Sequence, residues 1–277
     1  MQIFKGIVIA LLLAVLGGCA SMTPGGRVQQ TGSVVDYLYP NSKNVPVMQA
    51  SVTQLRPPVR VGIAFVPGSG WGNTLTEEQK MKLLSRVKAA FSKHEYIGSI
   101  EIIPTTYMRA QGGFENLDQV ARMFNVEVVA LLSYDQVQFN DTNALAVLYW
   151  TIVGAYVVHG DKYDVQTMVD ASVFDVKSHK LLFRAPGTSQ VKGNASMAGF
   201  SEASRAARGE GYDKAVEQLI PQLQTELDGF RERIKSDASF QVANKEGYKG
   251  SGALDGWMIA LAAVLAALVY GKRRRAR

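Results

Sequence analysis

Apolar residues in the central part of the chain form short runs bounded by turn residues, and these alternate with stretches of helical spacing. Residues 59–66 (VRVGIAFV) are an apolar run enclosed by prolines, which is the pattern of a buried strand. Thr76 and Gln79 then form a capping-box pair, which predicts a helix that extends to about His94. Its expected apolar stripe consists of Met81, Leu84, Val87, Lys88 and Phe91, with Lys88 as the imperfect position.

A second strand, a second helix and a third strand follow. Residues 99–103 are typical of a strand that Pro104 stops, and residues 116–124 of a helix. Residues 126–134 form an apolar run that begins directly after this helix. A helix that passes at once into a buried strand indicates a β-α-β unit.

Residues 144–158 are apolar throughout, but they are too few to span a bilayer and Gly154 interrupts them. Their aromatic and β-branched residues favour a strand. We expect this segment to be buried in or docked on the domain, with contact to a membrane as the alternative.

Polar and apolar residues alternate over residues 163–176, and residues 181–191 return after a turn at residues 177–180. This pattern predicts a long antiparallel hairpin with one face on the core. A last helix is expected from Ser201, with an interruption at residues 209–211 and a bend at Pro221. Its apolar stripe consists of Tyr212, Val216, Leu219, Leu223, Leu227, Phe230 and Ile234.

These elements predict an α/β sandwich of the α+β kind. We expect a single mixed sheet that contains the antiparallel hairpin, with helices mainly on one face. The expected segments are a signal peptide (1–18), a lipidated N-terminus and flexible tether (19–58), a periplasmic α/β domain (59–235), a linker (236–252), a transmembrane segment (253–271) and a basic cytoplasmic tail (272–277).

The N-terminus carries an export signal. Residues 1–18 contain a positive start, an apolar run and small residues, and the sequence Leu-Gly-Gly before Cys19 resembles a bacterial lipobox. The resemblance implies cleavage before Cys19 and attachment of a membrane lipid to its thiol. Ala20, where an aspartate would retain the protein, implies sorting to the outer membrane. Cys19 is the only cysteine, so no disulfide forms within one molecule.

The C-terminus combines a Gly-Ser-Gly hinge, an apolar segment and a basic end. Residues 253–270 are just long enough to cross a hydrocarbon core as a helix. Lys272, Arg273, Arg274 and Arg275 follow, and positive charge stays on the cytoplasmic side. The body is therefore expected in the periplasm, attached to the inner membrane until the C-terminal segment is removed.

The net charge of +6 comes from these two ends. Without Lys5, Asp255 and the five basic residues after Gly252, 24 basic and 23 acidic residues remain. The body is therefore nearly neutral, and we expect no nucleic-acid partner.

Candidate chemistry in the body is sparse. Gly68, Ser69, Gly70 and Trp71 lie between a strand and a helix, where anion-binding loops occur, but no P-loop lysine follows. A plain glycine turn is the favoured interpretation. The three histidines have no ligand partners at metal-binding spacing. We expect no metal, no cofactor and no catalytic activity.

The lipobox together with the C-terminal segment resembles the rhombotarget lipoproteins, which carry a sorting segment of the GlyGly-CTERM type. That segment is similar to a sortase-style tag recognised by rhombosortase, an intramembrane serine protease of the rhomboid class. The resemblance implies cleavage near Gly250, Ser251 and Gly252 and release from the inner membrane. Gly-Ser-Gly stands here where the family has Gly-Gly.

Three functions are compatible with these features. The first is a non-enzymatic envelope lipoprotein, processed at its C-terminus, whose body binds an unknown envelope protein. The second is a scaffold that stays anchored at both ends and serves a cell-wall or secretion assembly. The third and weakest is a surface enzyme with a pocket at Ser69–Trp71.

Overall fold

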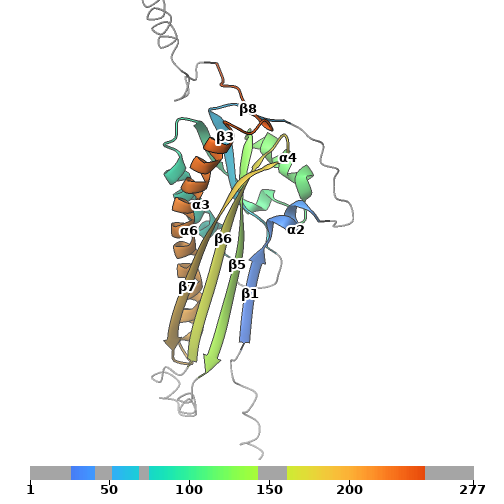
Figure 1. Cartoon of the computed structure of the whole chain (residues 1–277). Coiled ribbons are helices and arrows are strands. Elements are labelled where there is room, and N and C mark those ends of the chain that lie inside the picture. Colours follow the sequence, from blue (N-terminus) through green and yellow to red (C-terminus); the bar gives the residue numbers. More distant parts are fainter. Residues whose placement is uncertain (1–25, 41–51, 69–74, 143–160, 247–277) are drawn as a thin grey trace, which may run out of the picture.

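The computed structural model describes residues 26–40, 52–68, 75–142 and 161–246, which form one mixed α/β domain (Figure 1). Its main sheet has six strands in the order β4-β3-β5-β6-β7, with β1 also paired to β5. The elements are β1 (Gly26–Gly32), α2 (Val34–Leu38), β2 (Thr53–Leu55), β3 (Val59–Phe65), α3 (Glu77–Phe91), β4 (Ile97–Ile102), a 3-10 turn (Thr105–Tyr107), α4 (Gly113–Met123), β5 (Val128–Thr142), β6 (Asp161–Asp175), β7 (Leu181–Ala195), α6 (Phe200–Arg233) and β8 (Phe240–Val242).

Strand β5 has two partners on one of its edges. Its first part pairs with β3 in parallel, from Val61 opposite Val128 to Phe65 opposite Leu132. Its second part pairs with β1 in antiparallel fashion, while β6 accompanies its whole length on the other edge. We call the half of the domain that contains β3 and β4 the body. The half with β1, residues 133–142, 161–170 and 186–195, and the start of α6 is the arm.

The body buries both faces of the sheet. Alternate β3 residues point to opposite sides, so that Ile63 and Phe65 pack with α3 and α6, whereas Ala64 and Val66 pack with α2 and α4. The single mixed sheet and the long hairpin agree with the prediction. The expectation of helices mainly on one face holds for the two longest helices, but α2 and α4 cover the second face of the body.

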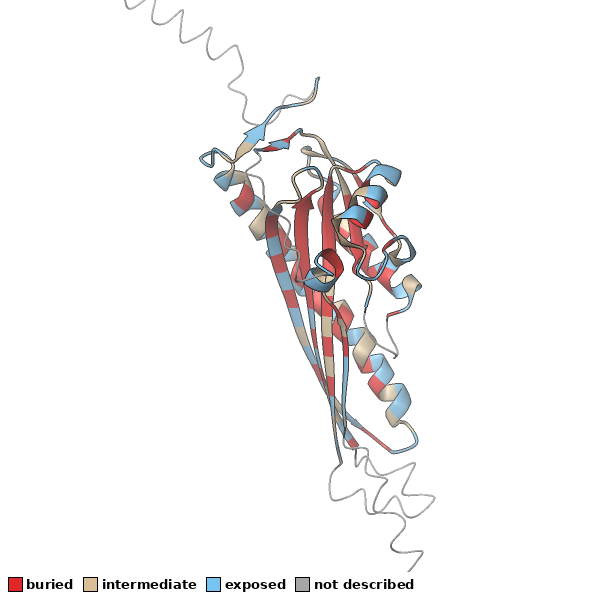
Figure 2. Cartoon of the chain, turned by 90° about the vertical axis from the view of Figure 1, so that its right-hand side faces the viewer, coloured by how far each residue is buried: buried red, intermediate tan, exposed pale blue. Residues whose placement is uncertain are grey.

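The arm buries one face. Figure 2 shows buried positions alternating with exposed ones along the strands of the arm, whereas β3, β5 and β6 carry continuous buried runs in the body, at residues 62–65, 128–132 and 171–175. The uncovered side of the arm is mostly polar, although Phe139 and Met168 are about 40% exposed there. Gln29 donates to Asp135 at 3.1 Å, and Gln190 donates to Asp164 at 2.8 Å. An antiparallel sheet tolerates one solvated face in this way.

Helix α3 has the predicted N-terminus. Thr76 caps it and forms the capping box with Gln79. The predicted stripe is wrong at two positions, because Met81 and Lys88 do not belong to the buried side. Lys80 and Leu83 are buried in their place, and Lys80 pairs with Glu77 at 2.9 Å. A long lysine stem can cover apolar surface while its ammonium meets a carboxylate.

Helix α6 runs without a break through Gly209 and Gly211, contrary to the expected interruption. Gly211 is buried against the sheet, where a Cβ atom would come 2.5 Å from the Thr167 hydroxyl. At Gly187 of β7, a Cβ atom would overlap the Ala215 carbonyl oxygen and lie 2.6 Å from the Leu219 nitrogen. These two glycines therefore let helix and sheet approach closely, which is why α6 continues where its own sequence predicts a stop.

The segments expected as a tether and a linker contribute to the fold. β1 joins the main sheet, and α2 docks through the buried side chains of Tyr37 and Leu38. β2 pairs in parallel with β8, which comes from the segment expected to be a linker. The composition of both segments resembles that of a flexible linker. Their strands are short or polar, and each forms only by pairing with a strand that is distant in sequence.

Several predictions lie outside the described residues. These are the signal peptide, Cys19, the segment at residues 144–158, the Gly-Ser-Gly hinge, the transmembrane segment and the basic tail. Within the described ranges, no helix combines the length and apolar character needed to cross a membrane.

Candidate ligand-binding cavity

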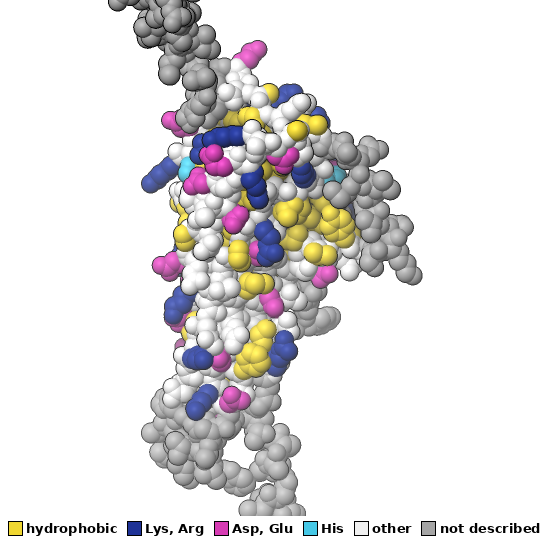
Figure 3. Space-filling model, in the orientation of Figure 1, with side chains coloured by type: hydrophobic (Ala, Val, Ile, Leu, Met, Phe, Trp, Pro, Cys, Tyr) yellow, Lys and Arg dark blue, Asp and Glu magenta, His cyan; other side chains and the backbone are white. Residues whose placement is uncertain are grey.

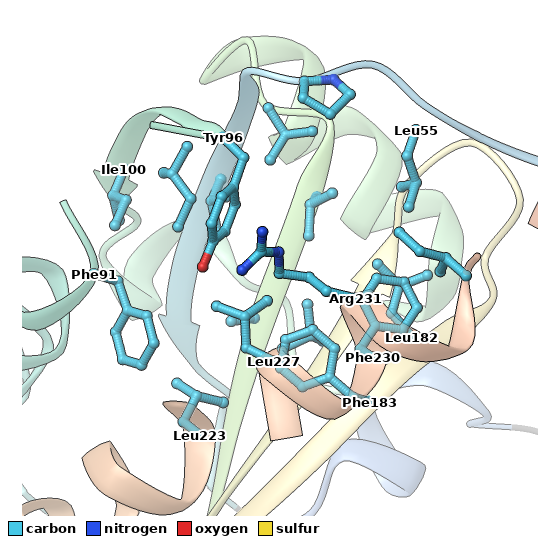
Figure 4. A pocket seen from close by; sticks show the side chains of 18 of the residues that line it. Leu55, Phe91, Tyr96, Ile100, Leu182, Phe183, Leu223, Leu227, Phe230 and Arg231 are labelled. Atoms are coloured by element: carbon cyan, nitrogen blue, oxygen red, sulfur yellow. The ribbon is translucent and has the colours of Figure 1, made fainter. Parts of the chain in front are cut away.

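The body contains an apolar cavity of about 620 Å³ that opens to solvent between the sheet and helices α3 and α6 (Figure 4). Strands β3 to β7 form its floor, and the two helices form its walls. Its apolar lining consists of Leu55, Pro57, Val59, Val61, Ile63, Val87, Phe91, Tyr96, Ile97, Ile100, Val128, Ala130, Val173, Leu182, Phe183, Leu223, Leu227, Phe230, Ile234 and Val242. This volume lies within the range of small-molecule sites in proteins, which is about 300–1,000 Å³.

Aromatic rings hold one wall of the cavity in place. The Phe230 ring of α6 lies 5.4 Å from that of Phe183 and 5.5 Å from that of Phe240, centroid to centroid. Phe230 is buried, whereas Leu227 and Ile234 on the same helix face are half-buried. The predicted stripe of α6 is thus correct, but its last turns face a cavity instead of a filled core.

A row of stacked groups crosses the rim from α6 to the end of α3. The Arg231 guanidinium lies 4.7 Å from the centre of the Tyr96 ring, and the His94 ring stacks on the same tyrosine with its centroid at 5.0 Å. His94 also forms a hydrogen bond with Gln224 of α6, at 2.9 Å. Figure 4 shows Arg231 and Tyr96 reaching toward each other across the opening.

Two cations mark the rim. Of the described residues that line the cavity, only Arg231 and Lys235 are charged. Each has an acidic neighbour on α6 that does not line the cavity: Asp228 lies 3.7 Å from Arg231, and Glu232 lies 2.8 Å from Lys235. Both charged side chains that line the cavity are therefore cations, and their acidic neighbours lie outside the lining.

The C-terminal segment closes another side of the cavity. Val242 and Asn244 line it, and Lys245 fastens the segment by contacts to Glu127 at 2.8 Å and to the Pro58 carbonyl at 2.9 Å. Burial alone would raise the pKa of Glu127. The hydrogen bonds from Lys245 and the Arg60 amide, with the charges of both residues, outweigh burial and lower that pKa below its usual value.

This arrangement is suited to binding an apolar molecule. Apolar side chains that face a void lack the dispersion contacts of a filled core, and a ligand that fills the void supplies them. Within the parts of the chain that the structure describes, no three His, Cys, Asp or Glu side chains gather to hold a metal ion.

The predicted loop residue Gly68 packs against Tyr134, where β1 and β3 meet beside β5. A Cβ atom on Gly68 would overlap the Tyr134 hydroxyl, so a glycine is needed for the close approach. Tyr134 also packs edge-on against Tyr212 at 6.1 Å. Burial raises the pKa of both tyrosines, with a further contribution from Glu77 at Tyr134. Ser69, Gly70 and Trp71 lie outside the described residues.

The other predicted site residues also lie outside the described residues. They are Cys19, Gly250, Ser251, Gly252, Lys272, Arg273, Arg274 and Arg275. The structure places the ends nearest to them far apart, with Gly26 at the tip of the arm and Glu246 at the opposite end of the domain (Figure 1).

His179, expected only as a turn residue, attaches the β6–β7 turn to α4. Its ring stacks on Phe114 at 4.2 Å and its Nε2 lies 2.9 Å from an Asp118 oxygen. The backbone at His179 has a positive φ of 56°, a conformation that a tight turn can require.

Sequence reasoning missed the cavity and its rim. Arg231 follows directly on the buried Phe230, and Tyr96 lies just before β4, so nothing local marks them as neighbours. A possible signal was the pair Arg231 and Lys235, because their four-residue spacing puts both cations on one side of a helix.

Charged side chains elsewhere do not gather into one large patch on the face seen in Figure 3. Lys and Arg alternate there with Asp and Glu along the length of the domain. This mixture matches the nearly neutral net charge of the chain between its two terminal signals.

No model of a known protein family matches the chain, and no curated protein matches its sequence. A protein described as a homologue of the neuraminyllactose-binding hemagglutinin of Helicobacter pylori aligns with a TM-score of 0.40 and 11% identity, over 70% of this chain and 97% of its own. The uncharacterized lipoprotein B of Nitrosomonas europaea aligns with a TM-score of 0.31 and 13% identity, over 69% of this chain and 97% of its own. A leucine-to-methionine variant of the PelC dodecamer of Paraburkholderia phytofirmans aligns with a TM-score of 0.27 and 14% identity, over 72% of this chain and 97% of its own. Similarity this low assigns the chain to no family and transfers no function.

Proposed function

We propose that the protein is a non-catalytic lipoprotein of the bacterial envelope whose body binds an apolar ligand. The cavity beneath α3 and α6 carries this proposal. It combines a ligand-sized volume with a lining in which Arg231, Lys235 and Asn244 are the only charged or amide side chains among the described residues. Catalysis of group transfer needs convergent polar groups in a pocket, and this lining consists mainly of hydrocarbon.

The sequence signals at the two ends of the chain support the proposed location in the bacterial envelope. Lipidation at Cys19 would hold the protein at a membrane, and cleavage near Gly250, Ser251 and Gly252 by an intramembrane protease would free its other end. A lipid-anchored protein cannot move to the outer membrane while a helix spans the inner one. Processing would therefore let the body reach the outer membrane or the surface, where an envelope protein is the expected partner.

Ligand binding can be tested with N-phenyl-1-naphthylamine, a neutral dye that fluoresces in apolar sites. The full chain, held in an amphipathic polymer, should enhance its fluorescence by a saturable amount. Leu227→Trp should abolish this component, because the indole would occupy the cavity that Leu227 lines. Met123→Trp on α4, where the native side chain is 66% exposed, is the matched control and should bind like the natural protein. Equal signals from both variants would contradict binding in the cavity.

Processing needs a separate measurement. Intact mass spectrometry of the mature protein reports the lipid on Cys19 and the residue at which the chain ends. An unchanged mass that includes Arg277, in cells with and without the rhomboid-type protease, would overturn the processing proposal.

The doubly anchored scaffold remains the second candidate because of one feature of the fold. The two ends of the described chain lie far apart along β5. Lys245 contacts Glu127 just before this strand, and Gly26 pairs with Asn140 near its end. The roughly 13 residues between Glu127 and Asn140 correspond to about 43 Å of strand. If both ends stayed attached to one membrane, the long axis of the domain would lie along the bilayer. Recovery of the protein in outer-membrane fractions would exclude this candidate.

A further inference from the structure

The cavity differs in polarity between its floor and its rim. Ile63, Ala130 and Val173 of the floor come from three different strands and are nearly inaccessible to solvent. Arg231 and Lys235 stand at the rim, where their side chains are 42% and 67% exposed. A ligand that matches this gradient has a long apolar part and one polar end.

The charge of the rim selects the sign of that polar end. The carboxylates of Asp228 and Glu232 lie outside the lining and are 58% and 73% exposed, whereas both cationic side chains line the cavity. An anionic group held in the cavity would therefore contact cationic side chains of the lining and neither of their two acidic neighbours. A cationic group would meet repulsion at the same place.

Arg231 is also prepared to bind an anion. A guanidinium offers several N–H donors in one plane, which match the two oxygens of a carboxylate. Stacking on Tyr96 holds this plane across the opening. The distance of 3.7 Å to Asp228 exceeds that of a hydrogen bond, so this carboxylate does not occupy the donors at close range.

We propose that the cavity binds a single-chain amphiphile of the fatty-acid class, with the hydrocarbon chain on the sheet and the anionic head at Arg231. This inference rests on the proposed function, because it specifies the ligand of the same cavity. Lys235 adds charge to the rim, and its pairing with Glu232 leaves Arg231 as the main contact.

Three ligands with the same chain length but different head charge test the inference. Palmitate, methyl palmitate and hexadecyltrimethylammonium would each be titrated against bound N-phenyl-1-naphthylamine, with the full chain in the same polymer at pH 8. Palmitate should displace the dye with an affinity about tenfold higher than methyl palmitate, and the cation should bind least. Shortening the acid should weaken binding by about two- to fourfold per methylene group.

Arg231→Gln should lower the affinity for palmitate by about tenfold and leave methyl palmitate unchanged. Arg205→Gln removes a similar charge from the exposed side of the same helix in the arm and serves as the control. Thermal unfolding of both variants should match that of the natural protein, which separates a lost contact from a lost fold.

The outcomes separate this inference from the proposed function. If methyl palmitate binds as tightly as palmitate and Arg231→Gln changes neither, the anionic head group is wrong although the cavity binds apolar chains. If none of the three ligands displaces the dye and Leu227→Trp does not change its fluorescence, the cavity itself is not a ligand site.

Discussion

In the body, α6 packs through large apolar side chains, whereas in the arm it packs mainly through small residues and polar groups, beside a small apolar cluster of Val165, Val191 and Ala207. Val216 and Leu219 are completely buried in the main core, and Phe230 is nearly so. In the arm, Gln136 donates to the Thr167 hydroxyl at 2.7 Å and to the Arg208 carbonyl at 3.0 Å. One helix therefore joins two regions whose cohesion has different physical origins.

The difference explains where space for a ligand arises. Large side chains on α3 and α6 face the sheet of the body, and the cavity lies between these helices and the strands. In the arm, small residues allow contact between backbones, and hydrogen bonds then fix the distance; Ser189, for example, donates to the Gly211 carbonyl at 2.7 Å. We infer that the arm holds α6 rigidly while its last turns bound the cavity.

Removing the close approach in the arm should have the largest effect. Gly187→Ala should lower the free energy of unfolding by about 2–4 kcal/mol, because the new methyl group would overlap the Ala215 carbonyl of α6. Gly209→Ala has open space around it and should instead raise stability by about 0.5–1 kcal/mol. Urea denaturation of the two variants measures both values. Similar losses at both glycines would contradict tight packing in the arm.

Truncations along α6 should distinguish filled core from cavity wall. Leu219→Ala should cost about 3 kcal/mol, because Leu219 is completely buried. Leu227→Ala should cost only about 1 kcal/mol, because Leu227 is half-buried and already borders the cavity. Thermal unfolding without added ligand provides the comparison, and equal costs would show that the cavity is filled by other groups.

The polar contacts of the arm can be tested at Gln136. Gln136→Leu should cost about 1–2 kcal/mol, because Thr167 and the Arg208 carbonyl each lose a donor in a buried place. The double variant Gln136→Leu with Thr167→Val should recover part of this loss, since it also removes a buried hydroxyl. Urea denaturation of the single and double variants gives the coupling, and simple additivity would argue against a shared network.

The attachment of the C-terminal segment should respond weakly to pH. Because folding lowers the pKa of Glu127 from 4.5, its contribution is present above that value and is lost as the pH falls through the folded-state pKa. The pair with Lys245 is partly exposed, so the change should be below about 1 kcal/mol.

Hydrogen-exchange protection of the Ala243 and Lys245 amides measures this attachment. These amides donate to the carbonyls of Leu55 and Pro57. Their protection should fall below about pH 4.5 in the natural protein, whereas Glu127→Gln should show low protection at every pH. If Glu127→Gln showed the same pH profile as the natural protein, the loss of protection at low pH would come from groups other than Glu127.

Local patterns predicted most of the body. The capping box at Thr76, the apolar run of β3 and the turn at residues 177–180 were identified correctly, because each depends on neighbours in sequence. β1 (GRVQQTG) was missed because its polar residues resemble a tether. Gln30 is buried because it pairs with Gln136 of β5, which lies more than 100 residues later in the sequence. The β2–β8 pair was missed for the same reason.

By itself the sequence determined which segments form strands and helices in the body, and it carries the signals at Cys19 and the C-terminus on which the proposed envelope function depends. Only the tertiary structure decided that α6 continues through Gly211, that Arg231 stacks on Tyr96, and that apolar faces of two helices leave a cavity instead of closing on each other. Periodicity reports which side of a helix is apolar, but the distance between helix and sheet depends on residues such as Gly187 in another element.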